Sequence, residues 1–445
     1  MNIYENPNVP LVLYTIALAL VGLSSVSGAY NSNIDSAIIM AIWSIIIFAY
    51  LIANNKGIKK IKNYLYIASV VLFPIFLFAY TTGWSAALYV VSVLAYPLPY
   101  IILLLFILFL AQLYLRSKTR LRWLFLGIAI IIIIAYFSLI ATQYIVTDES
   151  VISYYAYRAF LHGADPYSIN TSANLTYLHN KIGLGLTYTK NSTIVSNFRY
   201  PALYFLIQAP FYSFAIQNIQ YIGNNFSSVE IIAGMIFFLI AYLSLYKEKR
   251  RFANPSYAAI IMAAVLGINQ LILLLMLSLI LLMYSEFGKK YNWLILGIMI
   301  SLQEQLWIVA LLFIIYEFIA DRDKGTKVLT GAIAVFLLVN GYFIILNAHA
   351  FIAAFTGEIS NIVPNNTSAL SNIMLMFGVP SEIVTIAFLS AILVSISLLA
   401  WLKDYKLIPI LSVIPFLFLS HSGASYFVIP FIVFAFVNYS DKISK

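Results

Sequence analysis

The sequence predicts an all-α membrane protein, a polytopic helical bundle of about 14 spans. Of its 445 residues, 63% are hydrophobic and 9% are charged, whereas a soluble domain carries about 25% charged residues. Apolar runs long enough to cross roughly 30 Å of hydrocarbon recur from end to end. In lipid, such runs satisfy their backbone hydrogen bonds as helices. The chain has no cysteine, which excludes disulfides, thiolate metal sites and cysteine nucleophiles.

The positive charges predict the orientation of the bundle. All but four of the 25 Lys and Arg residues lie in clusters between the apolar runs or at the C-terminus, and such clusters mark the cytoplasmic face. The other four are Arg158, Lys181, Lys190 and Arg199, all within residues 146–200. The net charge of +9 therefore reflects membrane orientation and not a nucleic-acid partner. We expect a multi-pass plasma-membrane protein with both termini cytoplasmic and residues 146–200 outside the cytoplasm.

Five spans precede this external loop when the N-terminus is inside. They are expected near residues 11–30, 34–53, 64–82, 86–115 and 123–145. The next apolar stretch, 200–222, is broken by Pro201 and Pro210. A full crossing there would place a later basic cluster outside, so we expect a re-entrant or interfacial segment.

Two later apolar runs have polar residues at their centres. Asn269 and Gln270 lie midway along residues 256–284, and Glu304 lies midway along 293–319. Because each run starts and ends near basic residues, we expect each to be a pair of short helices whose tips approach the outer side. One long tilted span apiece is the alternative. Further spans are expected near 229–246, 328–346, 381–402, 407–420 and 424–440, with an external loop at 347–380 and an external tip at His421.

The chain is expected to divide into an N-terminal four-helix membrane module, residues 1–120, and a membrane core, residues 121–445, that includes the external loop 146–200. The start of this loop is where we expect the chemistry. After Asp148 and Glu149 an apolar helical face is formed by Ile152, Tyr155, Ala156, Ala159 and Phe160. The opposite face carries Tyr154, Tyr157, Arg158 and His162.

This pattern predicts an amphipathic helix along the outer membrane surface, ending at Gly163 before a turn at Asp165 and Pro166. The simplest interpretation of Asp148 is a helix N-cap, with Glu149 as a first-turn acid favoured by the helix dipole.

Four segments in order change this interpretation. They read "TDESVISYYAYRAFLHGADPYS", "FRYPALYFLIQAPFY", "LGINQLILLLMLSLILL" and "NNTSALSNIMLMFG". Together they resemble motifs of the GT-C membrane glycosyltransferases, particularly the polyprenyl-phosphate-mannose-dependent mannosyltransferases, over roughly residues 123–380. Two departures stand out: Glu304 lies near a position where many relatives have a Lys, and four helices precede the motif where many relatives have one.

The resemblance implies inverting transfer of a hexose, with mannose favoured, from a polyprenyl- or dolichyl-phosphate donor to an acceptor hydroxyl of a glycan, glycolipid or protein on the extracytoplasmic face. In this scheme Asp148 is the general base. Arg158 and Arg199 bind the donor phosphate, and Lys181 and Lys190 are weaker candidates. The other substrate-binding candidates are Glu149, Tyr155, Asp165, Tyr167, Tyr200, Gln270, Glu304 and His421. No cofactor is expected, although Asp148 and Glu149 would allow a divalent ion beside the phosphate.

Two alternatives stay open. The first is a polytopic transporter or lipid flippase without transferase activity, which should place ionisable groups near mid-membrane in repeated, broken helices. The charge here gathers at one surface, and no half-to-half repeat is evident. The second is an inactive scaffold, for which Asp148 is only a helix cap.

Overall fold

The computed structural model describes two parts of the chain in most detail, residues 148–209 with gaps and residues 271–418 with gaps. The described residues are 43, 46, 49–50, 61, 64–69, 71–72, 148–182, 186–188, 193–209, 237, 240–241, 271–356, 374, 377–418 and 433. The expected spans at 11–30, 86–115 and 123–145, and the candidates Lys190, Gln270 and His421, lie outside them.

The chain forms two compact units. The first unit comprises Met1–Leu126, Tyr246–Ile268 and Asn366–Lys445, and the second comprises Gly127–Leu245 and Asn269–Asn365. The division into modules at residue 120 stays a prediction. Helices make up most of the described residues, and the β structure among them is a single antiparallel bridge between Tyr188 and Ile194. The helical part of the fold prediction is therefore confirmed.

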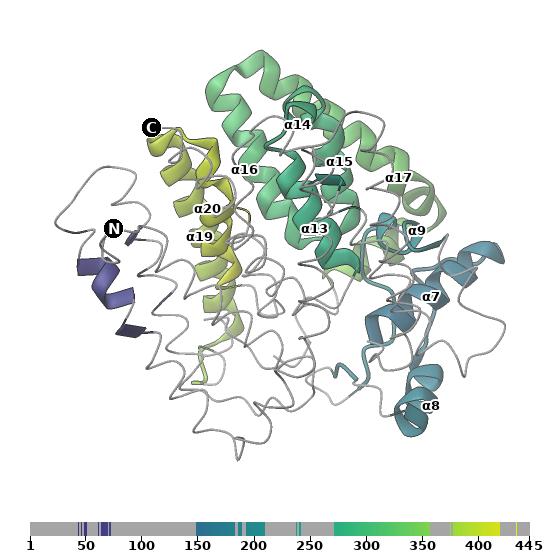
Figure 1. Cartoon of the computed structure of the whole chain (residues 1–445). Coiled ribbons are helices and arrows are strands. Elements are labelled where there is room, and N and C mark those ends of the chain that lie inside the picture. Colours follow the sequence, from purple (N-terminus) through teal and green to yellow (C-terminus); the bar gives the residue numbers. More distant parts are fainter. Residues whose placement is uncertain are drawn as a thin grey trace, which may run out of the picture. The chain divides into compact units, whose positions relative to one another are not determined.

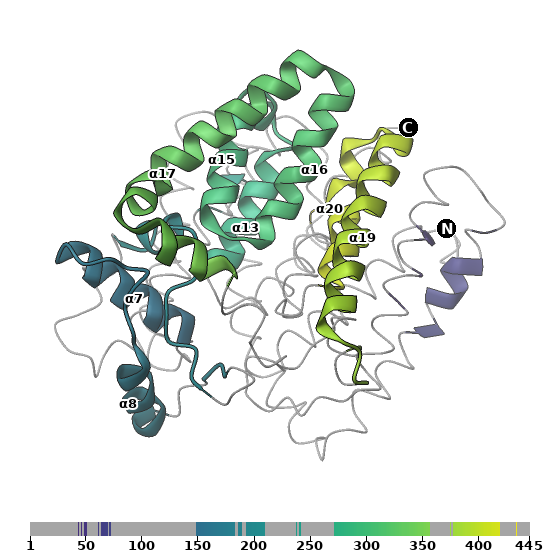
Figure 2. The ribbon, with the colours of Figure 1, turned by 180° about the vertical axis from the view of Figure 1, so that it is seen from behind.

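Three helices form the centre of the second unit. α17 (Arg322–Thr356) packs along both α15 (Asn292–Leu302) and α16 (Gln305–Ala320), as Figures 1 and 2 show from opposite sides. α13 (Leu271–Leu282) and α14 (Glu286–Lys290) contact α15. The helices are apolar on most sides, as expected of helices that contact either protein or lipid. In α17, Val328, Ala332 and Val335 are buried on one face, whereas Leu337 and Leu338 are exposed.

Glycines bring α15 and α17 close together. A Cβ at Gly297 would overlap the side chain of Val335, and a Cβ at Gly331 would overlap that of Trp293. Small residues of this kind allow close helix contact where neither water nor a bulky side chain separates the backbones. The crossing therefore depends on these two positions.

The pair of short helices expected over residues 293–319 is confirmed. α15 ends at Leu302, Gln303 adopts an extended conformation (φ −159°, ψ 143°), and α16 starts at Gln305. α15 has 11 residues and α16 has 16, so each is shorter than the roughly 20 residues of a typical transmembrane helix. Glu304 consequently lies at the tip of a helical hairpin and not inside a helix.

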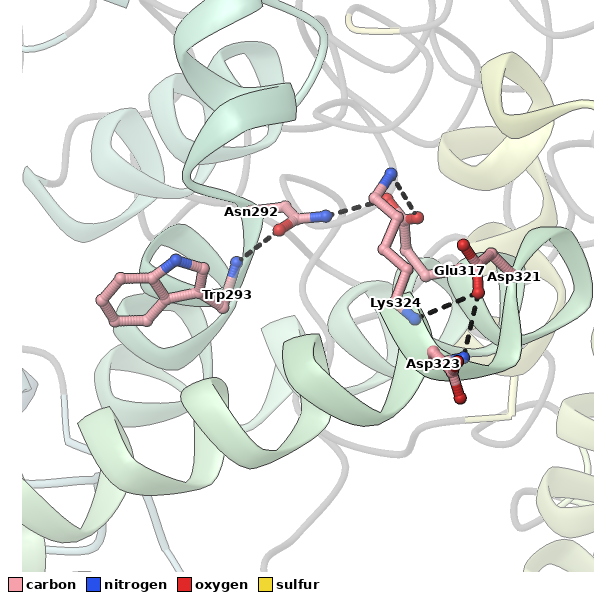
Figure 3. Close-up of polar contacts among 6 residues, drawn as sticks. All are labelled: Asn292, Trp293, Glu317, Asp321, Asp323 and Lys324. Carbon is pink, nitrogen blue, oxygen red and sulfur yellow. Dashed lines mark hydrogen bonds and ion pairs between the residues drawn. The ribbon is translucent and has the colours of Figure 1, made fainter.

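A polar lock holds the opposite end of this hairpin to α17 (Figure 3). The Asn292 side-chain amide donates to Oε1 of Glu317 at 2.8 Å, and Nζ of Lys324 lies 2.7 Å from Oε2 of Glu317. Oδ1 of Asp321 accepts from the backbone N–H groups of Asp323 and Lys324. One carboxylate thus ties together the start of α15, the last turn of α16 and the first turn of α17.

α17 extends beyond the expected span 328–346 and consists of two helical segments that meet at Asn347. Its φ of −158° and ψ of 82° are not helical, and its Oδ1 accepts from the backbone N–H of Ala350 at 3.0 Å. This is the geometry of an Asn helix cap. The expected span 328–346 therefore ends at this break, and a second helical segment continues to Thr356 within the expected loop 347–380, whose external position stays a prediction.

Two of the described helices are long and apolar enough to cross a membrane, Arg322–Phe355 with 34 residues and Glu382–Leu402 with 21. The second matches the expected span 381–402 and belongs to α19 (Ser381–Leu402) of the first unit. η4 (Tyr405–Leu407) and α20 (Ile408–Phe416) follow it, and α20 packs against α19.

Apolar side chains on these two helices point outward. Leu338 is 85% exposed, Ile345 is 89% exposed and Leu393 is 65% exposed. Contiguous apolar surface of this kind is typical of sites that contact lipid or another protein. The surface supports membrane association of both helices.

The polar lock makes a prediction for Glu317, whose side chain is only 13% exposed. Glu317→Ala leaves the Asn292 amide without its acceptor and Lys324 without its counter-ion. We expect the free energy of unfolding to fall by about 1–3 kcal/mol. Thermal unfolding of the purified protein measures this change.

The matched control is Glu286→Ala, because Glu286 pairs with Lys289 on the surface, where its side chain is 69% exposed. Such a pair contributes about 0–1 kcal/mol. Equal losses of unfolding free energy in the two variants would show that the polar lock stabilises the fold no more than a surface ion pair does.

Candidate functional site

Asp148 is the first residue of α7 (Asp148–Leu161) and is buried, with 7% of its surface exposed. Its Oδ1 accepts from the backbone N–H of Glu149 at 3.0 Å, one residue along the chain, whereas a helix N-cap accepts from an N–H two or three residues along. Its Oδ2 accepts from the backbone N–H of Thr187 at 2.8 Å. The carboxylate thus joins the start of α7 to a residue 39 positions further along the chain.

Glu149 is half-buried beside Asp148 and contacts two tyrosines. The Tyr200 hydroxyl donates to its Oε1 at 2.6 Å, and the Tyr204 hydroxyl lies 3.5 Å from its Oε2. The two rings are stacked, with centroids 4.1 Å apart and planes 12° apart. The stack places both hydroxyls on the same carboxylate.

Arg199 is the cation of the site. It is 8% exposed, and its guanidinium carbon lies 5.9 Å from the centroid of the Tyr200 ring. It interacts electrostatically with Glu149 and Asp148. Its Nη1 is buried and has no hydrogen-bond partner among the residues that the structure describes. Since a guanidinium carries five N–H donors in a fixed fork, Nη1 is available to bind an oxygen of a ligand.

The charges of these side chains shift one another's pKa. Burial, followed by the negative charge of Asp148, raises the pKa of Glu149, while Tyr200, Arg199 and Tyr204 act to lower it. Burial acts to lower the pKa of Arg199, but Tyr200, Glu149 and Asp148 outweigh it, and the net pKa is raised. Arg199 therefore stays protonated at any physiological pH, and Glu149 holds a proton to a higher pH than an ordinary glutamate.

The tip of the α15–α16 hairpin lies near these groups. Glu304 interacts electrostatically with Arg199 and with Glu149, and its Oε1 accepts from the side-chain amide of Gln305 at 3.0 Å. α9 (Leu203–Leu206), which begins four residues after Arg199, contacts both α7 and α15. The structure thus brings together Asp148, Glu149, Arg199 and Glu304, four of the residues singled out from sequence, with Tyr200 between them.

Buried neighbours hold the segment that contains Arg199. The Ala202 backbone N–H donates to Oδ1 of Asn340 at 2.8 Å, and the Tyr167 hydroxyl donates to the Tyr200 carbonyl at 2.9 Å. Tyr167 is 4% exposed and packs edge-on against Phe198. Tyr167, expected to stack on substrate, therefore positions Tyr200 in this structure.

The end of α7 agrees with the sequence in part. Gly163 has a φ of 72°, a conformation that favours glycine, and it ends the helix where expected. Tyr154, however, was expected on the polar face and is 7% exposed. Its ring packs edge-on against Tyr155 at 5.4 Å, because a tyrosine can bury its ring while its hydroxyl stays polar. Arg158 is exposed, 6.0 Å from the Tyr154 ring, and is not part of the buried group.

Asp165 makes contacts within its own turn and with α17. Its Oδ1 accepts from the Tyr167 backbone N–H at 3.0 Å, and its Oδ2 accepts from the Asn347 side-chain amide at 3.0 Å. These bonds give Asp165 a structural role at the break in α17. Lys181 is exposed, and its Nζ lies 3.1 Å from the Tyr177 hydroxyl.

Three residues of the site were not identified from sequence: Tyr204, Ser301 and Asn340. Asn340 lies within the apolar run of α17 and is fully buried, and Ser301 lies within that of α15. A polar residue inside an apolar helix is the signal that could have identified both. Tyr204 follows Tyr200 by four residues in a segment expected to be re-entrant, and that spacing was the available clue.

Comparisons with known proteins do not indicate a function for this chain, so its function is inferred from the site. No protein-family model, curated protein or solved structure matches this chain. A buried guanidinium with a free donor, next to acids that accept protons, suits a site that binds an anionic group and moves a proton.

The shifted pKa of Glu149 makes a prediction about stability. Above the ordinary value of 4.5, the folded chain holds a proton on Glu149 that the unfolded chain has lost. Stability therefore falls as the pH rises from 4.5 to the raised pKa. We expect the native protein to lose thermal stability over this range relative to Glu149→Gln, which cannot ionise.

Melting curves recorded from pH 4.5 to about pH 8 test this, with Glu286→Gln as the control, because Glu286 is exposed. Parallel pH profiles for the native protein and Glu149→Gln would contradict the shift.

Proposed function

We propose that this chain is an integral membrane glycosyltransferase that moves a hexose, with mannose favoured, from a polyprenyl- or dolichyl-phosphate donor to an acceptor hydroxyl. The observation that carries the proposal is the buried Arg199. Its Nη1 has no hydrogen-bond partner among the described residues, and its guanidinium interacts electrostatically with Asp148 and Glu149. A lipid phosphate leaving group needs a fixed cation, and attack by a hydroxyl needs a base. The site has both.

The reaction balances with these groups. The acceptor oxygen attacks the anomeric carbon and gives its proton to Asp148, and the bond from that carbon to the donor phosphate breaks. The phosphate leaves with the electron pair, and the guanidinium of Arg199 stabilises its charge. Attack opposite the leaving group inverts the anomeric centre. The step needs no nucleotide and no metal in its stoichiometry.

The proposed orientation places this site on the extracytoplasmic face of the plasma membrane, in a multi-pass protein with both termini cytoplasmic. The partners are the lipid-linked donor, membrane lipids and a glycan, glycolipid or protein acceptor. Two apolar helices of spanning length support the membrane setting. The GT-C architecture and the total of about 14 spans are part of the proposal.

Replacement of the proposed base should abolish transfer. Asp148→Asn keeps the size of the side chain but cannot take a proton, so we expect the rate to fall by about 10²- to 10⁴-fold. The measurement is sugar transfer from a synthetic polyprenyl-phosphate hexose by the purified protein. Asp323→Asn, at an exposed position of α17, is the matched control.

Thermal unfolding shows whether Asp148→Asn is folded, since its amide can replace only one of the two accepted hydrogen bonds. Equal transfer by the native protein and folded Asp148→Asn would remove Asp148 from the mechanism. Transfer by neither would favour a transporter or scaffold.

Arg199 allows a separate test of donor binding. Arg199→Gln removes the charge, and we expect binding of a prenyl phosphate to weaken by about 10- to 100-fold. Arg199→Lys keeps the charge but loses the planar fork, and an intermediate loss is expected. Isothermal titration measures both, with Arg322→Gln on the exposed start of α17 as the control. Unchanged affinity in Arg199→Gln would exclude this residue as the phosphate ligand.

A further inference from the structure

The tip of the α15–α16 hairpin contains polar atoms that nothing in the described protein satisfies. Ser301 Oγ, Glu304 Oε2 and Gln305 Oε1 are buried without a hydrogen-bond partner, as is Arg199 Nη1. Ser301 is fully buried and Gln305 is 4% exposed. The first three atoms belong to a segment of five residues, and Glu304 interacts electrostatically with Arg199.

Such a concentration of unsatisfied atoms requires a cause. A buried polar group without a partner loses its hydrogen bonds to water without compensation, and roughly 90% or more of buried polar groups in folded proteins are paired. Two other buried polar residues of the same unit are paired, since Asn340 bonds to Ala202 and Thr171 bonds to Ser196. The unpaired atoms are therefore best explained by a ligand that completes their hydrogen bonds.

The hydrogen-bonding capacity of these atoms limits the chemical class of the ligand. Two of them are acceptor oxygens, on Glu304 and Gln305, and need a donor. Arg199 needs an acceptor, and Ser301 can serve as either. An anion alone would satisfy Arg199 and leave the two acceptors unpaired. A cation would satisfy the acceptors but would be repelled by the adjacent guanidinium. A polyhydroxylated group has neighbouring oxygens that both donate and accept hydrogen bonds, so it can satisfy all four buried atoms.

We propose that the segment from Ser301 to Gln305 is a subsite for sugar hydroxyls, distinct from the phosphate contact of Arg199. Glu304 and Gln305 accept hydrogen bonds from the hydroxyls, and Ser301 completes the set. The inference rests on the proposed function and names the part of the donor that the hairpin tip recognises. It also accounts for an acid at this tip: a carboxylate accepts hydroxyl hydrogen bonds, whereas a lysine there could only donate.

The test compares ligands with and without a sugar. Purified full-length protein in a detergent without a sugar headgroup is titrated with farnesyl phosphate, with mannosyl farnesyl phosphate and with octyl mannoside. The native protein should bind the mannosyl compound at least about tenfold more tightly than farnesyl phosphate. Glu304→Gln and Gln305→Met should bring this ratio close to one, and Gln305→Met, which changes no charge, should leave farnesyl phosphate affinity within about twofold.

The control is Glu286→Gln, an exposed substitution of the same chemical type in the same unit. Gln305→Met keeps the volume of a buried side chain, so it provides a second variant if Glu304→Gln disturbs the tip. Thermal unfolding confirms that each variant is folded.

The outcomes separate the two proposals. Binding of farnesyl phosphate with no gain from the sugar, in the native protein, overturns the subsite and leaves the proposed donor. Binding of octyl mannoside that depends on Glu304 and Gln305, without any affinity for farnesyl phosphate, supports the subsite and overturns the donor. Retention of the full sugar gain in both variants overturns the subsite, and failure to bind any of the three ligands overturns both proposals.

Discussion

The burial of the Arg199 guanidinium is the constraint on which the described site depends. Removal of a cation from water costs several kcal/mol unless opposite charge and hydrogen bonds compensate. Asp148 and Glu149 provide the charge, and each is itself held, the first by Thr187 and the second by Tyr200. Thr187, the start of α7 and the segment before α9 therefore all lie around a single positive group.

The same arrangement gives the site more acidic than basic side chains. Three carboxyl groups, those of Asp148, Glu149 and Glu304, share the charge of Arg199. Such an excess favours a retained proton or a ligand that donates hydrogen bonds. The proposed substrate, a hydroxyl-rich group with an anionic leaving group, would meet both needs if its hydroxyls contact the acids and its phosphate contacts the cation.

Composition and spacing predict the helices and several site residues, but they do not predict how the site is held. Glu304 stood out because it interrupts an apolar run, and Arg199 because it is a rare external cation. The approach of these two residues depends on the packing of α9 against α15, a contact between distant segments that no local pattern encodes. Asn340 could be identified as a polar residue in an apolar run, but its role and that of Tyr204 could not be predicted, since their partners lie 138 and 55 residues away in the chain.

α17 is fastened at two points, near its start through Lys324 and Glu317 and at its break through Asn347 and Asp165. Between Arg322 and Leu346 it is a continuous rod of about 37 Å at 1.5 Å per residue. A rod anchored at both ends acts as a strut. It fixes the distance along the helix axis between Asn340 and the end of the hairpin that carries the lock. Because Asn340 accepts from the backbone N–H of Ala202, the position of the site along this axis is fixed as well.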